Sequence, residues 1–161
     1  PTVQVDFNLP QRFNLTYVAE DGKEKTPVMV HRAILGSLER FMGALIEQYG
    51  GAFPTWLAPV QAIVLPISEK FLAYGEKITT ELKAAGIRAE LDRRGEKIGA
   101  KIRDAQMQKI PYMLIVGEKE QTAGTVAIRH RSRGDLGAKP LSDFLFDVKP
   151  EIRYNNETNG G

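Results

Sequence analysis

The sequence Ala62-Ile63-Val64-Leu65 is an uninterrupted apolar run, and it is followed by residues 69–85, which have helical spacing and end at Gly86. Continuous apolar strands are typical of parallel sheets, because helices cover both faces of such a strand. The alternation continues along the chain, with predicted strands at 87–91 and 112–116 and a predicted helix at 96–109. Strands separated by helices of this length form βαβ units, so the pattern predicts a parallel sheet built through right-handed crossovers.

The end of this region departs from the parallel pattern. Residues 117–124 form a predicted polar turn, so the strand predicted at 125–131 is expected to be antiparallel, and a last short helix is predicted at 141–149. Residues 60–150 are therefore predicted to be an α/β domain with a mixed, mainly parallel sheet flanked by helices. Residues 155–161 have no apolar side chain to anchor the end of the chain, and residues 151–161 are predicted to form a flexible tail.

A proline-rich segment separates this domain from the residues before it. Pro54 and Pro59 disfavour helix and remove two backbone donors. Before this boundary, strands are predicted at 13–19 and 28–35, and the helix that follows them has its apolar residues in one stripe. Residues 1–55 are therefore predicted to be a separate strand–strand–helix region.

Composition excludes several classes of protein. The chain has 161 residues, of which 42% are hydrophobic and 26% charged, as in an ordinary globular protein. It has no cysteine, which excludes disulfides, a thiolate nucleophile and thiolate metal ligands. Its apolar runs are far shorter than a membrane span needs, and no secretory signal opens the chain, so a cytoplasmic location is predicted. The net charge of +2 is too small to predict a nucleic-acid partner by itself.

The segment 31–41 changes at Gly36-Ser37 from a strand-like apolar run to helical spacing, with Arg40 at the start of the helix. This segment resembles motif 3 of class II aminoacyl-tRNA synthetases. Similarity to the threonyl-tRNA synthetases extends over further segments, which are 2–7, 53–61 and the remainder up to Ile152. The resemblance implies a C-terminal piece of such an enzyme. The first region would then be the remnant of an antiparallel class II catalytic core, and the second an anticodon-binding domain.

The resemblance implies a nucleotide site around Arg40. The family uses this arginine to hold ATP phosphate, and a cation beside a Gly-Ser pair at a helix start suits that role. From the residues alone, a surface arginine paired with Glu39 or Glu47 is the simpler alternative. The other residues at positions that line the family's adenylate pocket are Thr2, Gln4 and Ser37.

The resemblance also implies a zinc ligand. The family's zinc is held by one cysteine and two histidines, and His31 matches the last of these, so the other two are expected upstream of Pro1. From the residues alone His31 is a strand histidine, because His130, the other histidine, belongs to the second region. Zinc and Mg-ATP are therefore predicted as cofactors of the intact enzyme, and no cofactor is predicted for this chain alone.

The second region is rich in basic residues. They form two groups in the sequence, namely Arg93, Arg94, Lys97, Lys101, Arg103 and Lys109, and then Arg129, Arg131, Arg133 and Lys139. Strand alternation buries Val126 and Ile128 and is expected to expose Arg129 and Arg131 together. Such groups suit RNA phosphates and single-stranded bases, although charge alone favours an ordinary solvated surface.

The resemblance assigns these residues to RNA. Those expected to contact anticodon bases are Glu120, Arg129, Gly95, Arg94 and Lys109. Those expected to contact tRNA phosphates are Lys97, Lys101, Arg103 and Arg131. Gly95 departs from the family, in which many members carry asparagine, so any side-chain contact from that position is lost.

The function that the resemblance implies is that of a threonine–tRNA ligase, which joins threonine to its tRNA with ATP. This chain would be the part that recognises the anticodon, and alone it is predicted to be inactive and monomeric, whereas the intact enzyme is predicted to be a homodimer. The alternative is a stand-alone tRNA-binding adaptor or regulatory paralogue without ligase activity. The retained Ser37 and Arg40 argue against a degenerate paralogue.

Overall fold

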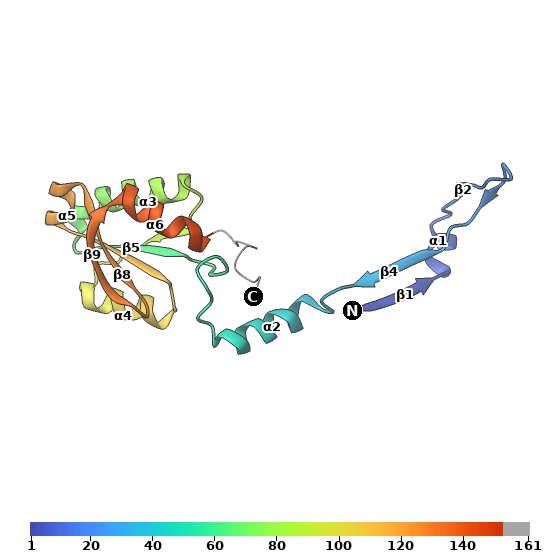
Figure 1. Ribbon diagram of the computed structural model, residues 1–161, viewed down its shortest axis with the longest axis horizontal. Coiled ribbons are helices and arrows are strands. Elements are labelled where there is room, and N and C mark those ends of the chain that lie inside the picture. Colours follow the sequence, from blue (N-terminus) through green and yellow to red (C-terminus); the bar gives the residue numbers. More distant parts are fainter. Residues whose placement is uncertain (153–161) are drawn as a thin grey trace. The chain divides into compact units, whose positions relative to one another are not determined.

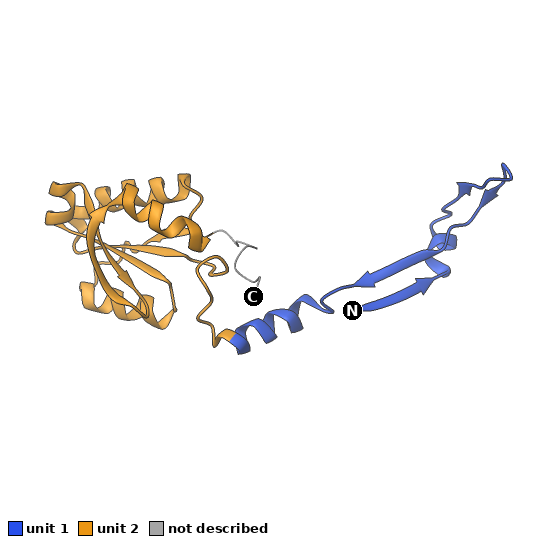
Figure 2. Cartoon of the chain, in the orientation of Figure 1, with its two compact units in different colours: residues 1–48 blue, residues 49–161 orange. Residues whose placement is uncertain are grey.

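The computed structural model describes residues 1–152 (Figure 1) and divides the chain into two compact units, residues 1–48 and 49–161 (Figure 2). Residues 153–161, which make up most of the predicted tail, lie outside the described part. No helix of residues 1–152 is both long and apolar enough to cross a membrane.

The second unit is built on one five-stranded sheet. Its strands are β5 (Ala62–Pro66), β6 (Ala89–Leu91), β7 (Tyr112–Val116), β8 (Thr125–His130) and β9 (Gly134–Pro140). The strand order is β6-β5-β7-β8-β9, in which β5 pairs in parallel with β6 and β7, while β8 pairs antiparallel with β7 and β9. The predicted α/β fold with a mixed sheet is therefore confirmed.

Helices cover both faces of this sheet (Figure 1). A short 3₁₀ turn, η1 (Glu69–Phe71), leads into α3 (Leu72–Ala84), which shares one core with α6 (Leu141–Ile152). On the other face, α4 (Ile98–Met107) contributes to a second core. Side chains of β5 alternate between these cores, with Val64 in the first and Leu65 in the second. This alternation is why the apolar run of β5 is continuous.

Three elements of this unit differ from the sequence prediction. Strand β9 was not predicted, because its sequence Gly-Asp-Leu-Gly-Ala-Lys-Pro has no alternating apolar pattern. Its presence divides the pairings equally between parallel and antiparallel, so the sheet is less dominated by parallel pairing than expected. The predicted turn before β8 contains a short helix, α5 (Glu118–Ala123). Helix α6 continues through Pro150 to Ile152, so Glu151 and Ile152 belong to a helix and not to the tail.

The first unit contains two small sheets and two helices. Strand β1 (Thr2–Asp6) pairs antiparallel with β4 (Met29–Ala33), and β2 (Tyr17–Val18) pairs with β3 (Glu24–Lys25). The helices are α1 (Asn8–Arg12) and α2 (Leu38–Tyr49). The structure differs from the two strands predicted at 13–19 and 28–35: only the short β2–β3 hairpin forms within residues 17–25, and β4 pairs with β1.

The first unit has almost no core. Among residues 1–48, all of which the structure describes, only Pro10 is buried. The apolar stripe of α2 is exposed, with Leu38 at 69% and Met42 at 59%. In the second unit, by contrast, Val64 and Leu114 are fully buried. Because burial of apolar area is the main source of stability, the two units must differ strongly in local stability.

We therefore expect hydrogen exchange to be much faster in the first unit. The opening that exposes the amides of β1 and β4 to exchange is expected to cost a free energy near zero, since few buried contacts oppose it. For the amides of β5 and β7 this free energy is expected to approach the free energy of global unfolding. Hydrogen–deuterium exchange of the 161-residue chain, read by mass spectrometry, measures both. Equal protection of β4 and β7 would contradict this assignment.

Candidate functional site

The topology creates an edge where three loops meet. From the carboxyl end of β5 the chain passes through α3 to β6 on one side, and α4 then returns it to β7 on the other side. In open α/β sheets, ligands bind in the crevice outside the carboxyl ends of the strands at such a reversal. The segments that follow these strands are residues 67–68, which lead into η1, residues 92–97, and Gly117, which leads into α5.

Two glycines show how closely the loops approach each other. A Cβ atom at Gly117 would lie 2.5 Å from Cδ1 of Ile67, so a side chain at this position would require the Ile67 side chain to move. A Cβ atom at Gly95 would lie 3.7 Å from Oε1 of Glu69, which is an ordinary contact distance. Gly95 therefore has room for a side chain, and its lack of one leaves open space beside the Glu69 carboxylate.

Glu120 is oriented by its own helix. Its Oε2 accepts a hydrogen bond at 3.0 Å from the backbone N–H of Gly117, the residue that precedes α5. The side chain is half-buried. A carboxylate accepts several hydrogen bonds, so this one fixes its position while leaving acceptor capacity for a ligand.

Arg94 is held by two carboxylates at the same edge. Its Nη2 donates to Asp92 Oδ2 at 2.7 Å, and its Nη1 donates to Asp104 Oδ2 at 2.7 Å. The side chain of Asp92 is only 3% exposed. Burial raises the pKa of Asp92, but the hydrogen bonds and the charge of Arg94 outweigh burial and hold that pKa below its usual value. The Arg94 guanidinium, which is half exposed, is therefore engaged by two carboxylates of its own domain; the sequence prediction assigned it to an anticodon base.

Lys101 is buried, with 3% of its surface exposed. Its Nζ donates to the carbonyl oxygens of Pro66 and Asp92, at 3.1 and 3.4 Å. The prediction that Lys101 contacts tRNA phosphate does not fit this position, because a phosphate cannot reach the ammonium. Two other cations predicted for phosphate, Lys97 and Arg103, are exposed, and their side chains form no hydrogen bond or ion pair within residues 1–152.

Arg129 lies on the α4 side of the sheet. Val126 and Ile128 are buried on the opposite side, as the predicted alternation requires, and Arg129 pairs across from Met113 of β7. A register shift in the β8–β9 pairing between Ile128 and Arg129 marks a bulge, a feature that re-aims side chains. The Nε of Arg129 is the one buried side-chain nitrogen or oxygen of the described residues that has no hydrogen-bond partner.

Arg131 and Lys109 lie at the amino ends of the parallel strands. The guanidinium of Arg131 donates to the carbonyl oxygens of Lys109 at 2.7 Å and Ala52 at 2.9 Å, and also to that of Phe53. The Nζ of Lys109 donates to the carbonyl oxygen of Gly50 at 2.6 Å. These cations therefore hold the proline-rich segment onto its own domain. Arg129 and Arg131 are both partly exposed, but the donors of the Arg131 guanidinium are engaged by backbone carbonyl oxygens.

Arg88 and Gln61 hold the same segment, and neither was predicted as a functional residue. Arg88 donates to the carbonyl oxygens of Trp56 and Ala58, and the buried amide of Gln61 donates to that of Thr55 at 2.9 Å. In the sequence, Arg88 and Gln61 are only a basic residue and an amide residue next to predicted strands. Nothing near them in the sequence indicates that their side chains bind backbone carbonyl groups.

The first unit brings three predicted residues onto one face of the β1–β4 pair. Thr2 and Gln4 alternate along β1, and Gln4 lies opposite His31 of β4. The side chain of Arg40 is exposed on the first turn of α2, and its backbone N–H donates to Ser37 Oγ at 3.2 Å. Ser37 therefore caps the helix that carries Arg40.

The described residues do not complete a zinc site. His31 Nε2 lies 3.3 Å from Asp6 Oδ2, and Asp6 also accepts hydrogen bonds from the backbone N–H groups of Asn8 and Leu9. Within residues 1–152 no three histidine, cysteine, aspartate or glutamate side chains lie close enough to hold a metal ion. A catalytic zinc needs three protein ligands, so His31 and Asp6 do not fit zinc by themselves.

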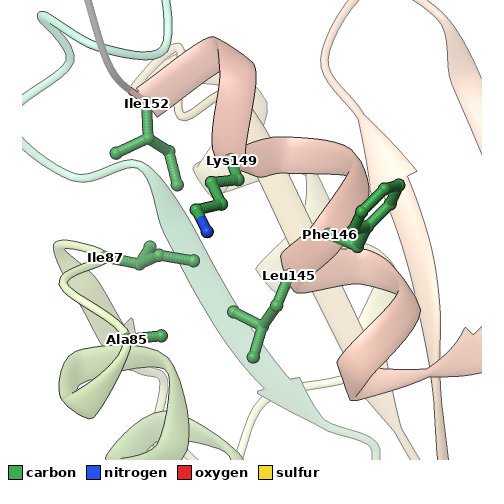
Figure 3. A pocket seen from close by; sticks show the side chains of 6 residues that line it. All are labelled: Ala85, Ile87, Leu145, Phe146, Lys149 and Ile152. Atoms are coloured by element: carbon green, nitrogen blue, oxygen red, sulfur yellow. The ribbon is translucent and has the colours of Figure 1, made fainter.

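A pocket of about 480 Å³ opens in the second unit between the end of α3 and helix α6, on the face of the sheet that α4 does not cover (Figure 3). Its lining residues are Ala85, Ile87, Leu145, Phe146, Lys149 and Ile152. Lys149 is the only charged side chain among them, and no predicted site residue lines the pocket. The pocket therefore does not share the chemistry of the loop edge.

Comparisons with known proteins match both units. The anticodon binding domain family matches residues 61–149, and the class II core domain of tRNA synthetases (G, H, P, S and T) matches residues 1–49. The threonine–tRNA ligase of Acidobacterium capsulatum is 62% identical over 144 residues, which are 89% of this chain and 21% of that protein. The chain belongs to the threonyl-tRNA synthetase family. It corresponds to the C-terminal part, in which the end of the class II core precedes the anticodon binding domain.

Other threonyl-tRNA synthetases agree. The threonine–tRNA ligase of Thermus thermophilus is 56% identical over 152 residues, 94% of this chain and 23% of that protein. The chain thus spans about a quarter of the length of the curated relatives it matches. The crystal structure of the RNA binding domain of threonyl-tRNA synthetase from Cryptosporidium parvum has a TM-score of 0.70 and 38% identity, and the match covers 92% of this chain and 38% of that one. A histidyl-tRNA synthetase from Nostoc, at 20% identity and a TM-score of 0.56, shares the fold alone.

The charge of Asp92 is expected to stabilise this threonyl-tRNA synthetase domain in a pH-dependent way. Because the pKa of Asp92 is lower in the folded state than its usual 3.8, its contribution is present above pH 4 and is lost as the pH falls through the lowered value. Asp92→Asn is expected to lower the free energy of unfolding by about 1–3 kcal/mol at pH 7, since Arg94 and Lys101 lose a charged partner.

Urea denaturation of the second unit at pH 7 and at pH 3 measures this difference. The matched control is Glu90→Gln, at an exposed position of β6 two residues before Asp92. It is expected to change the free energy of unfolding by less than about 0.5 kcal/mol. A loss on Asp92→Asn that is equally large at both pH values would show that the carboxylate charge is not the stabilising feature.

Proposed function

We propose that this chain is the tRNA-recognising part of a threonine–tRNA ligase and that residues 61–149 bind the anticodon arm of threonine tRNA. The observation that carries the proposal is the match of residues 61–149 to the anticodon binding domain family. Arg129 is partly exposed on the α4 side of the sheet, and its Nε has no hydrogen-bond partner within the described residues, so that nitrogen does not tie the guanidinium to an internal acceptor. The match to the anticodon binding domain family supports a nucleic-acid acceptor.

The chemistry of the remaining groups fits single-stranded bases. Splayed anticodon bases present Watson–Crick edges, on which a guanidinium donates to carbonyl and ring-nitrogen acceptors and a carboxylate accepts from amino groups. Arg129 and Glu120 supply these two functions. Lys97 and Arg103 are exposed and unpaired within residues 1–152, so they are available for phosphates. Gly95 offers backbone and open space, and no side chain, to a base.

For the first unit we propose the role of an ATP-binding corner of the ligase. Arg40 would meet ATP phosphate at the start of α2, and the polar side chains of Thr2, Gln4 and Ser37 would line the adenylate. In the whole enzyme, which we propose to be a cytoplasmic homodimer, His31 would hold zinc together with ligands from outside this chain. The support is the match of residues 1–49 to the class II core and the shared face of Thr2, Gln4 and His31.

The 161-residue chain is expected to bind an anticodon stem-loop of threonine tRNA more tightly than a loop with a swapped anticodon. Arg129→Ala and Glu120→Gln are each expected to reduce that preference by about 1–3 kcal/mol, because each removes a contact to a base edge. Glutamine at position 120 keeps an acceptor for Gly117, so it tests the carboxylate and not the helix cap. Binding titrations with both RNAs at two salt concentrations measure the effect.

Matched controls come from the same chain. Glu118→Gln is on α5, where the glutamate is exposed, and Lys149→Ala removes a cation from the opposite face of the sheet. Both are expected to leave the preference unchanged. Equal affinity of the unaltered chain for the two RNAs would reduce the domain to a generic basic surface and would refute the anticodon assignment.

A second expectation concerns adenylation. In a full-length ligase with this sequence, Arg40→Ala is expected to slow ATP–pyrophosphate exchange by about 10²- to 10³-fold, the usual loss on removing one electrostatic contact to a transition state. Arg32→Ala is the control, since Arg32 pairs with Val3 on the other face of β4. The 161-residue chain alone is expected to show only background exchange. Normal exchange in the Arg40 variant would show that Arg40 makes no transition-state contact with ATP and would refute this role.

A further inference from the structure

The buried Lys101 joins three elements at the loop edge. A buried ammonium is costly unless its protons meet acceptors, and Nζ of Lys101 meets two backbone carbonyl oxygens, of Pro66 at the end of β5 and of Asp92 just after β6. Since Lys101 belongs to α4, this single group fixes the helix against the carboxyl ends of two neighbouring strands.

Asp92 continues the network from that point. Its backbone N–H donates to the carbonyl oxygen of Val64 at 3.0 Å, and its backbone carbonyl accepts from Lys101. Its carboxylate accepts from the backbone N–H of Arg94 at 2.9 Å and from the Arg94 guanidinium. Arg94 then reaches Asp104 on α4. Both backbone groups and both carboxylate oxygens of Asp92 are thus used.

The network encloses the segment 93–97 at both ends. At its start stands Asp92, and at its end the carbonyl of Lys97 accepts from the backbone N–H groups of Ala100 and Lys101 on α4. Between these points lies Gly95, beside the Glu69 carboxylate. A segment of five residues with both ends fixed in this way has little freedom to change the path of its backbone.

We propose that Lys101, Asp92 and Arg94 are positioning residues for anticodon recognition: they hold the backbone of residues 93–97 in the shape that the anticodon meets. The proposal rests on the function proposed above. Lys101 acts from inside the fold and touches no RNA phosphate. An apolar side chain of similar length at position 101 would avoid the cost of desolvating a charge. The ammonium of Lys101 therefore contributes more to the position of the surrounding backbone than to the free energy of unfolding.

The test separates positioning from phosphate contact. Lys101→Met removes the ammonium at nearly constant length, and Lys97→Met makes the same change one helical turn earlier, at an exposed position. Lys101→Met is expected to reduce the preference for the threonine anticodon loop over the swapped loop by about tenfold, with an unchanged slope of log affinity against log salt. Lys97→Met is expected to keep the preference and to flatten the slope by about 0.7–0.9.

A second variant protects the test against unfolding. The Arg94 side chain is half exposed, so Arg94→Gln breaks the network with a smaller effect on folding. It is expected to lower the preference by a similar factor, and its amide NMR shifts are expected to change mainly in residues 92–97. Thermal unfolding of each variant verifies that the domain is folded.

The outcomes are distinguishable. A flattened salt slope in Lys101→Met would make Lys101 a phosphate contact and would overturn the proposal, as would full preference in a folded Arg94→Gln. If the unaltered chain shows no preference between the two loops, the anticodon function itself fails, which the titration of that chain alone reveals.

Discussion

The second unit depends on the burial of β5 along its whole length and on both faces. A strand that contributes to two cores has to lie inside the sheet, with a parallel neighbour on each side and helices above and below. The chain moves from β5 to β6 and then back across β5 to β7, and because both crossovers have the same hand, this reversal places α3 and α4 on opposite faces of the sheet. The edge at the carboxyl ends of the strands, where Gly95 lies beside Glu69 and Gly117 lies beside Ile67 and Glu120, is therefore a consequence of the same burial.

The basic residues of this unit divide by their partners and not by their charge. Lys101, Arg88 and Arg131 direct their donors at backbone carbonyls, and Arg94 bridges two carboxylates. Lys97 and Arg103 meet no partner within residues 1–152. A count of lysines and arginines therefore overstates the cationic surface that RNA can reach. Affinity that depends on phosphates rests on the few exposed cations, while the inward-facing cations shape the loops around them.

Part of this arrangement could be predicted from the sequence, and the reason is physical. Runs such as 62–65 and 112–116 consist of apolar residues throughout, as a strand buried on both faces requires. The α/β fold could therefore be predicted from the sequence pattern alone. Strand β9 could not be predicted, because an exposed edge strand owes its pairing to its neighbour and not to its own side chains. The β1–β4 pairing also escaped prediction, since nothing local specifies a partner more than twenty residues away.

The site was predicted in a similarly uneven way. The alternation along residues 125–131 correctly predicted that Val126 and Ile128 are buried and that Arg129 lies on the other face, because successive side chains of a strand point to opposite faces of the sheet. Alternation could not tell that the strand ends at His130 and that Arg131 then turns to the carbonyls of Ala52 and Phe53. Long cationic side chains reach several ångströms from their Cα atoms, so their partners are decided by tertiary structure.

The two units differ in how well their apolar surfaces are covered. In the first unit, β1 and β4 place Thr2, Gln4 and His31 on one face and Val3 and Val5 on the other. A sheet with one apolar face is stable when a second layer covers that face, yet Val3 and Val5 remain 64% and 52% exposed. The apolar stripe of α2 is exposed as well. The sequence of this unit thus encodes a packing surface that the described residues do not cover, and the polar face that carries the proposed ATP contacts depends on that packing for its rigidity.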